Sequence, residues 1–170
     1  KKGNENIKVE LLKRIINEST GASNLERAIE LATKLHTGQT DKAGKAYIDH
    51  PLRVMNTVKS LGYDEDVQVA AVLHDTVEDT DLTIDDVRRE FGQRVADTVA
   101  LLSKLEGEQY GAFIDRIINS KNVDAMRVKL ADLTDNMDVS RLGREPDEWD
   151  KKRMNRYEKA FKKLTDASGG

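Results

Sequence analysis

Apolar side chains recur every three or four residues along most of the chain, which is the spacing of one buried face of an α-helix. No segment shows the sustained alternation of apolar and polar residues that is typical of a half-buried strand. Ser23 and Glu26 form a capping box, and Thr83 with Asp86 marks another helix start. The periodicity predicts helices over residues 7–18, 25–35, 51–62, 67–79, 84–91, 95–102, 113–118, 126–139 and 147–165. We therefore expect an all-α protein of about eight or nine helices around one core.

The composition narrows the function classes. The 170 residues carry a formal net charge of -3, with acidic and basic side chains mixed along the chain. A basic surface for nucleic acid polymers or anionic membranes is therefore not expected. The chain contains no cysteine, which excludes disulfides and thiolate metal sites, and no apolar run reaches the ~18 residues of a membrane span. We expect a cytoplasmic protein, and the sequence leaves its oligomeric state open.

The stretch VLHDTVEDT, residues 72–80, places one histidine and three carboxylates directly after the apolar run VQVAAVL. Burying an unpaired carboxylate is costly unless an opposite charge compensates it. On one continuous helix, Glu78 would lie one turn beyond His74, and Asp79 one turn beyond Asp75. The pattern leaves two interpretations open: the groups surround a metal ion, or they form a solvated acidic helix end.

A second polar group follows in KLADLTDNMD, which places Asp132, Asp135 and Asn136 on neighbouring faces of a later helix. These residues come directly after the apolar Leu130, so they are expected to lie beside the core. Lys129, close to Asp132 in the sequence, is interpreted as an ordinary surface charge.

Histidines and aspartates together favour a borderline or moderately hard divalent ion such as Mn, Fe, Co or Zn, because Ca and Mg sites use oxygen ligands alone. An ion of this kind lowers the pKa of a bound water and polarises a phosphoryl group. Glu78 and Asp79 would then orient or deprotonate that water.

Four ordered stretches give the chain its family likeness: ERAIELATKLHTGQTDKAGKAYIDHPLRV, AAVLHDTVEDTDLT, FGQRVADTVALLSK and VKLADLTDNMDVSRL. With these stretches the chain resembles the HD-domain metal-dependent phosphohydrolases. Within them it looks most like the hydrolase domain of RelA/SpoT-type enzymes and the stand-alone small alarmone hydrolases. The resemblance implies one helical HD phosphohydrolase domain over 1–170, with a motif core at about 25–142 and a C-terminal helix at about 147–165.

The resemblance also implies roles for individual residues. The family's metal ligands, which usually hold Mn²⁺, fall on His36, His74, Asp75 and Asp132. Its catalytic pair falls on Glu78 and Asp79. Its substrate contacts fall on Arg27 near the purine, Lys42 facing the phosphates and Asn136 at the sugar. The remaining histidine, His50, is implied to have a structural role, holding the IDHP turn through a hydrogen bond.

Two segments depart from the family pattern. Relatives with alarmone activity usually have Arg and Pro where this chain has Asp41 and Ala46, and Arg-Thr where it has Asp138 and Val139. The pocket is therefore expected to be less basic than in those relatives, although the metal ligands are retained.

The implied reaction is removal of pyrophosphate from the 3′ position of (p)ppGpp. Two alternatives remain: a phosphohydrolase of another nucleotide or phosphorylated metabolite, and a non-catalytic helical module that binds a nucleotide or a partner. The presence of a water-activating pair, Glu78 and Asp79, favours catalysis. Nothing after Leu142 resembles the synthetase domain of the long relatives, so we expect no alarmone synthesis by this chain.

Overall fold

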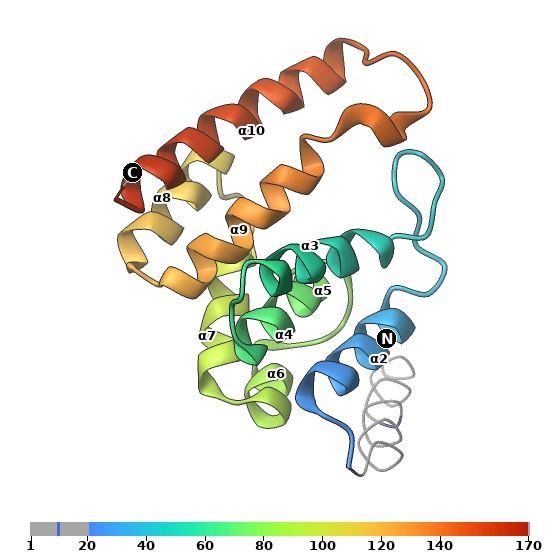
Figure 1. The fold of residues 1–170 in the computed structure, drawn as a ribbon, viewed down its shortest axis with the longest axis vertical. Coiled ribbons are helices and arrows are strands. Elements are labelled where there is room, and N and C mark those ends of the chain that lie inside the picture. Colours follow the sequence, from blue (N-terminus) through green and yellow to red (C-terminus); the bar gives the residue numbers. More distant parts are fainter. Residues whose placement is uncertain (1–9, 11–20, 170) are drawn as a thin grey trace.

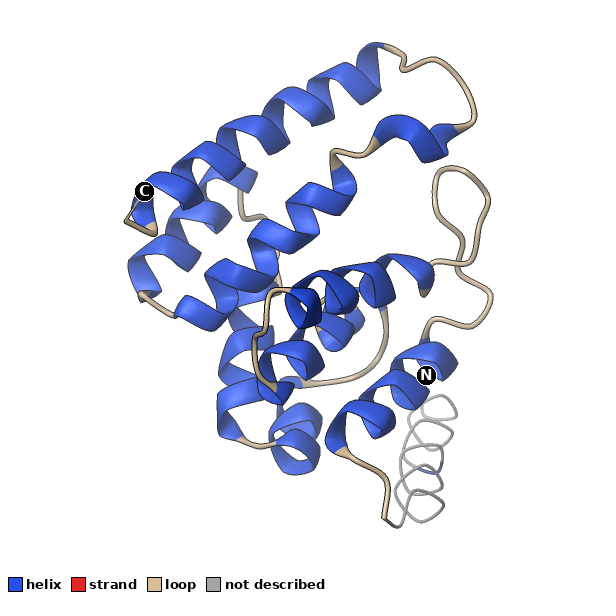
Figure 2. Ribbon diagram, viewed as in Figure 1, coloured by secondary structure: helices blue, strands red, loops and turns tan. Residues whose placement is uncertain are grey.

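The computed structural model describes Glu10 and residues 21–169. The helix expected over 7–18 therefore lies outside the described residues, apart from Glu10. The remainder is built from helices and loops, as Figure 2 shows. The elements are α2 (Asn24–Leu35), α3 (Asp49–Ser60), α4 (Glu65–Leu73), α5 (Thr76–Asp79), α6 (Ile84–Phe91), α7 (Gln93–Leu102), α8 (Tyr110–Ser120), α9 (Val123–Asn136), the 3₁₀ helix η1 (Val139–Leu142) and α10 (Glu148–Ala167). Within this part of the chain the structure has no strand, only one isolated bridge between Thr40 and Ala46, and the all-α prediction is confirmed.

Short-range capping explains where several helices begin. The Ser23 hydroxyl accepts a hydrogen bond from the Glu26 amide at 3.1 Å, and the Glu26 carboxylate accepts one from the Ser23 amide at 3.4 Å. This reciprocal pair satisfies amides that the first turn of α2 leaves without partners. Thr83 and Asp86 form the same arrangement at the start of α6, so both predicted helix starts are confirmed.

Helix α4 forms the centre of the core. Its residues Val67 and Val69–Leu73 are all buried, because α4 packs against α2, α3, α7 and α9. A helix that is apolar on every side is expected in such a position. In Figure 1 this short helix lies behind α3, between α2 and α7. The end of α4 is therefore held rigidly, and the acidic stretch begins there.

The helix predicted to continue through residue 79 is interrupted at His74 and Asp75, and this prediction was wrong. Two side chains compete for the carbonyls that would continue the helix. The Thr76 hydroxyl donates to the Leu73 carbonyl at 2.6 Å, and the His74 ring contacts the Ala71 carbonyl at 2.6 Å. The chain turns at this point before α5 starts, so His74 and Asp75 lie in a bend and not along one helical strip.

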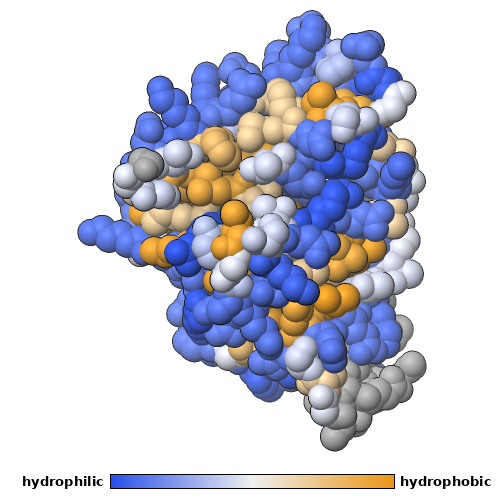
Figure 3. Space-filling view, in the orientation of Figure 1, coloured by the Kyte–Doolittle hydropathy of each residue, from blue (hydrophilic) through white to orange (hydrophobic). Residues whose placement is uncertain are grey.

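Helix α10 returns across the end of the bundle and packs against α8 and α9. In Figure 3, hydrophilic side chains cover the outer edge along α10, while apolar side chains lie between α10 and α9. No helix among the described residues combines the length and the apolar character needed to cross a bilayer.

Candidate metal centre and cavity

Donor atoms from three separate parts of the fold converge beside the end of α4. His50 lies in the first turn of α3, His74 and Asp75 lie in the bend after α4, and Asp132 lies on α9. One ligand atom each of His50, His74 and Asp75 lie within 4.8 Å of one another. The Asp132 Oδ1 atom lies 2.8 Å from His50 Nε2 and 3.3 Å from His74 Nε2. Both histidines and Asp132 are buried.

The orientation of His74 leaves one of its nitrogens unused. The Ala71 carbonyl can only accept, so the Nδ1 atom of His74 donates to it at 2.6 Å. The opposite nitrogen, Nε2, is buried and has no hydrogen-bond partner among the described residues. It nevertheless lies 3.1 Å from Asp75 Oδ2 and 3.3 Å from Asp132 Oδ1. One imidazole nitrogen and two carboxylate oxygens therefore face one another, which is a donor set that suits a divalent cation.

The pKa values of His74 and His50 also indicate that positive charge is stabilised at this site. Burial by itself lowers the pKa of His74, but Asp75 and Asp132 outweigh it and raise that pKa well above its ordinary value. Burial also opposes protonation of His50, yet its hydrogen bonds to Asp132 and Asp135 raise its pKa to about 9. A site that draws protons onto two buried histidines is one in which a metal ion can take the place of those protons.

His36, predicted as a ligand, is buried, and its Nε2 atom, like that of His74, has no hydrogen-bond partner among the described residues. It caps the end of α2, its Nδ1 atom lies 2.9 Å from the Gln39 side-chain oxygen, and its ring packs 5.0 Å from that of Tyr47. His50, predicted to hold its turn through a hydrogen bond, lies in the cluster with both ring nitrogens engaged: Nδ1 lies 2.6 Å from Asp135 Oδ2, and Nε2 lies 2.8 Å from Asp132 Oδ1. His36 thus has a ring nitrogen available to an ion, whereas Nε2 of His50 would first have to give up its contact with Asp132.

The predicted catalytic pair, Glu78 and Asp79, lies on α5 next to the cluster, and both residues are exposed. Glu78 lines the cavity and accepts a hydrogen bond from the Lys104 amide. Partial loss of hydration raises the pKa of Glu78, and the Asp75 and Asp79 carboxylates raise it further. The pKa of Asp79 is raised for the same reasons, with Asp75 as its main charged neighbour. Carboxylates with raised pKa values are better proton acceptors than ordinary surface carboxylates.

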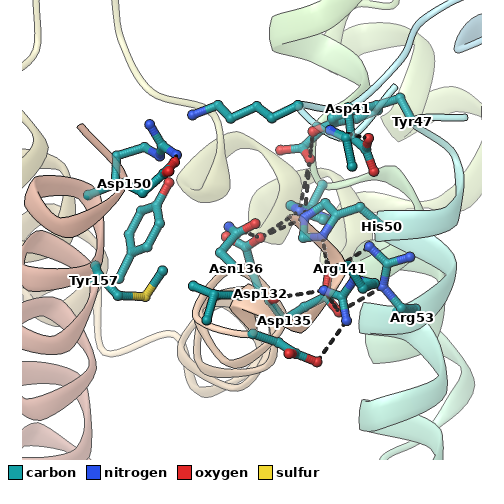
Figure 4. A pocket seen from close by; sticks show the side chains of 18 of the residues that line it. Asp41, Tyr47, His50, Arg53, Asp132, Asp135, Asn136, Arg141, Asp150 and Tyr157 are labelled. Atoms are coloured by element: carbon teal, nitrogen blue, oxygen red, sulfur yellow. Dashed lines mark hydrogen bonds and ion pairs between the residues drawn. The ribbon is translucent and has the colours of Figure 1, made fainter. Parts of the chain in front are cut away.

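A cavity of about 560 Å³ opens over the cluster and extends to α10. In Figure 4, Asp150 and Tyr157 face His50 and Asp132 across it from the opposite wall. Of the predicted substrate contacts, Lys42 and Asn136 line this cavity. Arg27 does not line it, so the expected purine contact is not supported. The Arg27 guanidinium instead joins α2 to α6 through an ion pair with Glu90 at 3.0 Å.

Two residues of the site were not found from the sequence. The Tyr47 hydroxyl donates to Asp75 Oδ2 at 2.5 Å and orients that carboxylate. Lys129, interpreted as a surface charge, is buried, and its ammonium lies 2.8 Å from Asp132 Oδ2. That interpretation was wrong. The spacing of three between Lys129 and Asp132 on one helix was the available signal, because it places the two side chains on the same face.

The chain was compared with known proteins. A family model described as HD domain matches residues 28–155. A GTP pyrophosphokinase of Streptomyces coelicolor is 38% identical over 139 residues, which is 77% of this chain and 16% of that protein. A guanosine-3′,5′-bis(diphosphate) 3′-pyrophosphohydrolase of Aquifex aeolicus is 33% identical over 145 residues, 81% of this chain and 20% of that protein. The chain therefore spans only a small part of the length of these curated relatives.

Among solved structures, one described as a metazoan ortholog of SpoT that hydrolyses ppGpp superposes with a TM-score of 0.71 at 27% identity. The match covers 86% of this chain and 85% of that one.

Proposed function

Because the chain belongs to the HD-domain family, we propose that it is a metal-dependent phosphohydrolase that acts on a nucleotide. The observation that carries the proposal is the convergence of His74, Asp75 and Asp132, together with the buried Nε2 atoms of His36 and His74, which have no hydrogen-bond partner among the described residues. The expected ion is Mn²⁺ or another divalent transition metal, because the ligand set mixes imidazole nitrogens with carboxylate oxygens. The proposed ligands are His36, His74, Asp75 and Asp132, and His50 would orient Asp132 through its hydrogen bond.

The residues around the ion would have separate roles in hydrolysis. A divalent ion bound there would supply positive charge that polarises a phosphoryl group and acidifies a water molecule. Glu78, with its raised pKa at the cavity wall, would accept the proton from the attacking water, and Asp79 would orient that water. The Tyr47 hydroxyl would keep the Asp75 carboxylate in one orientation through its hydrogen bond. The fold would thus limit unproductive geometries, because the loop before α3, the bend after α4, and helix α5 each hold part of the site.

The proposed substrate is (p)ppGpp, cleaved at its 3′-diphosphate. Lys42 and Lys104 both line the cavity, and neither ammonium makes a hydrogen bond or ion pair with a described residue. They are therefore available to phosphate oxygens. Asn136 donates to Asp132 Oδ1 at 3.1 Å and could also contact a ribose beside the cluster. A small nucleotide as substrate fits the expected cytoplasmic location, and both curated relatives are named for guanosine nucleotide chemistry.

A second candidate is hydrolysis of another nucleotide or phosphorylated metabolite. It is favoured by the carboxylates that also line the cavity away from the cluster, Asp41, Asp138 and Asp150. Asp41 is occupied in shaping its own loop, since its Oδ1 atom accepts the amides of Ala43 at 2.8 Å and Lys45 at 2.9 Å. These carboxylates would repel a substrate with many phosphates and tolerate one with fewer.

The experiment that tests the proposal measures pyrophosphate and phosphate release from ppGpp and from a panel of nucleotides in the presence of Mn²⁺. The double variant Glu78→Gln, Asp79→Asn should lose turnover by about 10²-fold or more, the scale of lost acid–base assistance. Its affinity for Mn²⁺ and nucleotide should remain close to that of the wild type, because neither residue belongs to the proposed ligand set. Glu106→Gln is the matched control, since Glu106 is exposed and does not line the cavity.

Release of pyrophosphate from ppGpp supports the first candidate, and preferential turnover of another phosphate ester supports the second. Absence of turnover on the whole panel, with nucleotide binding retained, would instead support a binding module.

A further inference from the structure

We propose that Arg116 is a positioning residue for Glu78, and that it acts through the single peptide group that joins Ser103 to Lys104. The inference rests on the proposed function, in which Glu78 accepts a proton from the attacking water. It adds a residue that does not line the cavity, because Arg116 lies on α8 and contacts the loop of residues 103–109.

The Glu78 carboxylate has little to hold it in place. Its side chain is exposed on the four-residue helix α5, and the neighbouring carboxylates of Asp75 and Asp79 repel it. Its one hydrogen bond with a described residue is accepted by Oε1 from the Lys104 amide. The other oxygen, Oε2, remains available to a water molecule. The direction in which Oε2 points therefore depends on where the Lys104 amide lies.

The Lys104 amide belongs to the same peptide group as the Ser103 carbonyl. The Arg116 Nη2 atom donates to that carbonyl oxygen at 3.0 Å. Because a peptide group is planar, a guanidinium that fixes the carbonyl also fixes the direction of the N–H bond. The positive charge beside the oxygen also polarises the group and strengthens its N–H as a donor. Arg116 and Glu78 are thus linked through one rigid unit.

A second set of contacts holds the same loop on the other side of Lys104. The Arg116 Nε and Nη2 atoms lie 2.9 and 3.0 Å from the two carboxylate oxygens of Glu108. The Glu108 Oε1 atom also accepts a hydrogen bond from the Leu105 amide at 3.0 Å. Arg116 therefore holds the preceding carbonyl directly and the following amide through Glu108. Only a guanidinium offers donors in the fixed fork that this arrangement uses.

Both ends of this linkage are anchored in the fold. Helix α8 packs against α7, α9 and α10, and Ile117, next to Arg116, is fully buried (Figure 1). The Arg116 guanidinium lies 5.5 Å from the centroid of the Phe113 ring, within the range of a cation–π contact. Ser103 is buried, and its hydroxyl donates to a carbonyl of α7 at 2.7 Å. The loop therefore starts from a fixed point.

The first test is steady-state hydrolysis of ppGpp by the full chain in Mn²⁺. Arg116→Met should lower kcat by about 10- to 100-fold, because misplacing a catalytic group by about 1 Å costs up to that much. The affinity for Mn²⁺ should be unchanged, since Arg116 contacts none of the proposed ligands. Arg116→Lys should fall between Arg116→Met and the wild type, because an ammonium keeps the charge and loses the fork.

Two double variants distinguish Glu78 from the Lys104 ammonium, which also lines the cavity. In a Glu78→Gln background, Arg116→Met should lower kcat no further, because the base that it positions is already lost. In a Lys104→Met background the full loss should persist, because methionine keeps the backbone amide. The reverse pattern would show that Arg116 acts through the ammonium, and it would overturn the inference.

Arg88→Met is the matched control. Arg88 is 42% exposed on α6, pairs with Asp85 on the same helix and does not line the cavity. Its kcat and its Mn²⁺ affinity should equal those of the wild type. Circular dichroism of each variant checks that the fold is retained.

A second readout needs no turnover. In nitrogen–proton correlation NMR of the metal-free wild type, the Lys104 amide proton should resonate downfield, as expected for an amide bound to a carboxylate. It should move upfield in both Arg116→Met and Glu78→Ala. An unchanged amide signal and an unchanged kcat in Arg116→Met would overturn the inference and leave the proposed function intact. A wild type with no turnover of ppGpp would overturn the proposed substrate, and the amide signal would still decide whether Arg116 holds Glu78.

Discussion

Replacing Lys129 with methionine tests how the buried charges of the site are balanced. The Lys129 ammonium lies 2.8 Å from Asp132 Oδ2, and both side chains are more than nine-tenths buried. The ammonium also lies over the rings of Tyr110 and Phe113, at 5.5 and 5.1 Å from their centroids. Methionine has a similar length and packs well against aromatic rings, so Lys129→Met should remove the charge and leave little empty space.

The magnitude follows from what remains around Asp132. Removing one partner of a buried ion pair typically costs about 3–5 kcal/mol. Here Oδ1 of Asp132 keeps its contacts with His50 at 2.8 Å and with Asn136 at 3.1 Å, and only Oδ2 loses its partner. We therefore expect Lys129→Met to lower the free energy of unfolding of the metal-free chain by about 2–3 kcal/mol.

A bound divalent ion would compensate part of the Asp132 charge that the loss of the Lys129 ammonium leaves unpaired. The loss should then shrink to about 1–1.5 kcal/mol in saturating Mn²⁺, which by linkage means that the variant binds Mn²⁺ about tenfold more tightly than the wild type. Urea unfolding of both proteins, in chelator and in Mn²⁺, measures all four free energies. Lys163→Met is the control, because Lys163 pairs with Asp115 at 2.7 Å on the surface with both side chains 52% exposed, and it should change stability by less than ~0.5 kcal/mol.

An equal loss of stability with and without Mn²⁺, or a smaller gain from Mn²⁺ in Lys129→Met, would refute the reasoning. Either result would mean that the ion does not share the charge of Asp132.

Two further predictions concern the choice of ligand and the pH dependence. His36→Ala and His74→Ala should each abolish Mn²⁺ uptake, because either change removes one of the four proposed ligands, and metal analysis after Mn²⁺ loading measures it; uptake retained in His36→Ala but lost in His50→Ala would instead make His50 the ligand. Hydrogen bonds from Arg144, together with Arg153, hold the pKa of Asp150 below its ordinary value. The ionised carboxylate therefore stabilises the fold above the unfolded-state pKa of about 4, and this stabilisation is lost as the pH falls toward the lower folded-state pKa. Asp150→Asn should thus be less stable than the wild type at pH 7, and thermal unfolding curves should show the difference closing below about pH 4; a constant difference across this range would contradict the assignment.

Local signals in the sequence were sufficient for most of the helices. The starts of α2 and α6 follow from capping boxes whose partners are three residues apart, and Gly92 separates α6 from α7 with a φ of 95° that favours glycine. The apolar run of α4 identified the core helix. Local patterns did not predict the bend at His74, because the helix is interrupted there by hydrogen bonds of the Thr76 hydroxyl and the His74 ring to backbone carbonyls.

Most residues of the site could also be predicted from the sequence. Four ordered stretches identified the family and pointed to His74, Asp75 and Asp132, each of which the structure brings to the cluster. They also assigned the first histidine ligand to His36 and a supporting hydrogen bond to His50, and His50 does make hydrogen bonds to Asp132 and Asp135.

The neighbours of these side chains are set by contacts between residues far apart in the chain. His50 meets Asp132 across 82 positions and Asp135 across 85, while Arg27 is drawn to Glu90 across 63 and so lies outside the cavity. Patterns of three and four residues carry information about helix faces and caps, because those interactions are local. Which faces meet is decided only when the helices pack. The burial of the Lys129 charge and the contact of Asp135 with His50 are therefore decided by the tertiary structure, whereas the helices and the donor types were determined by the sequence.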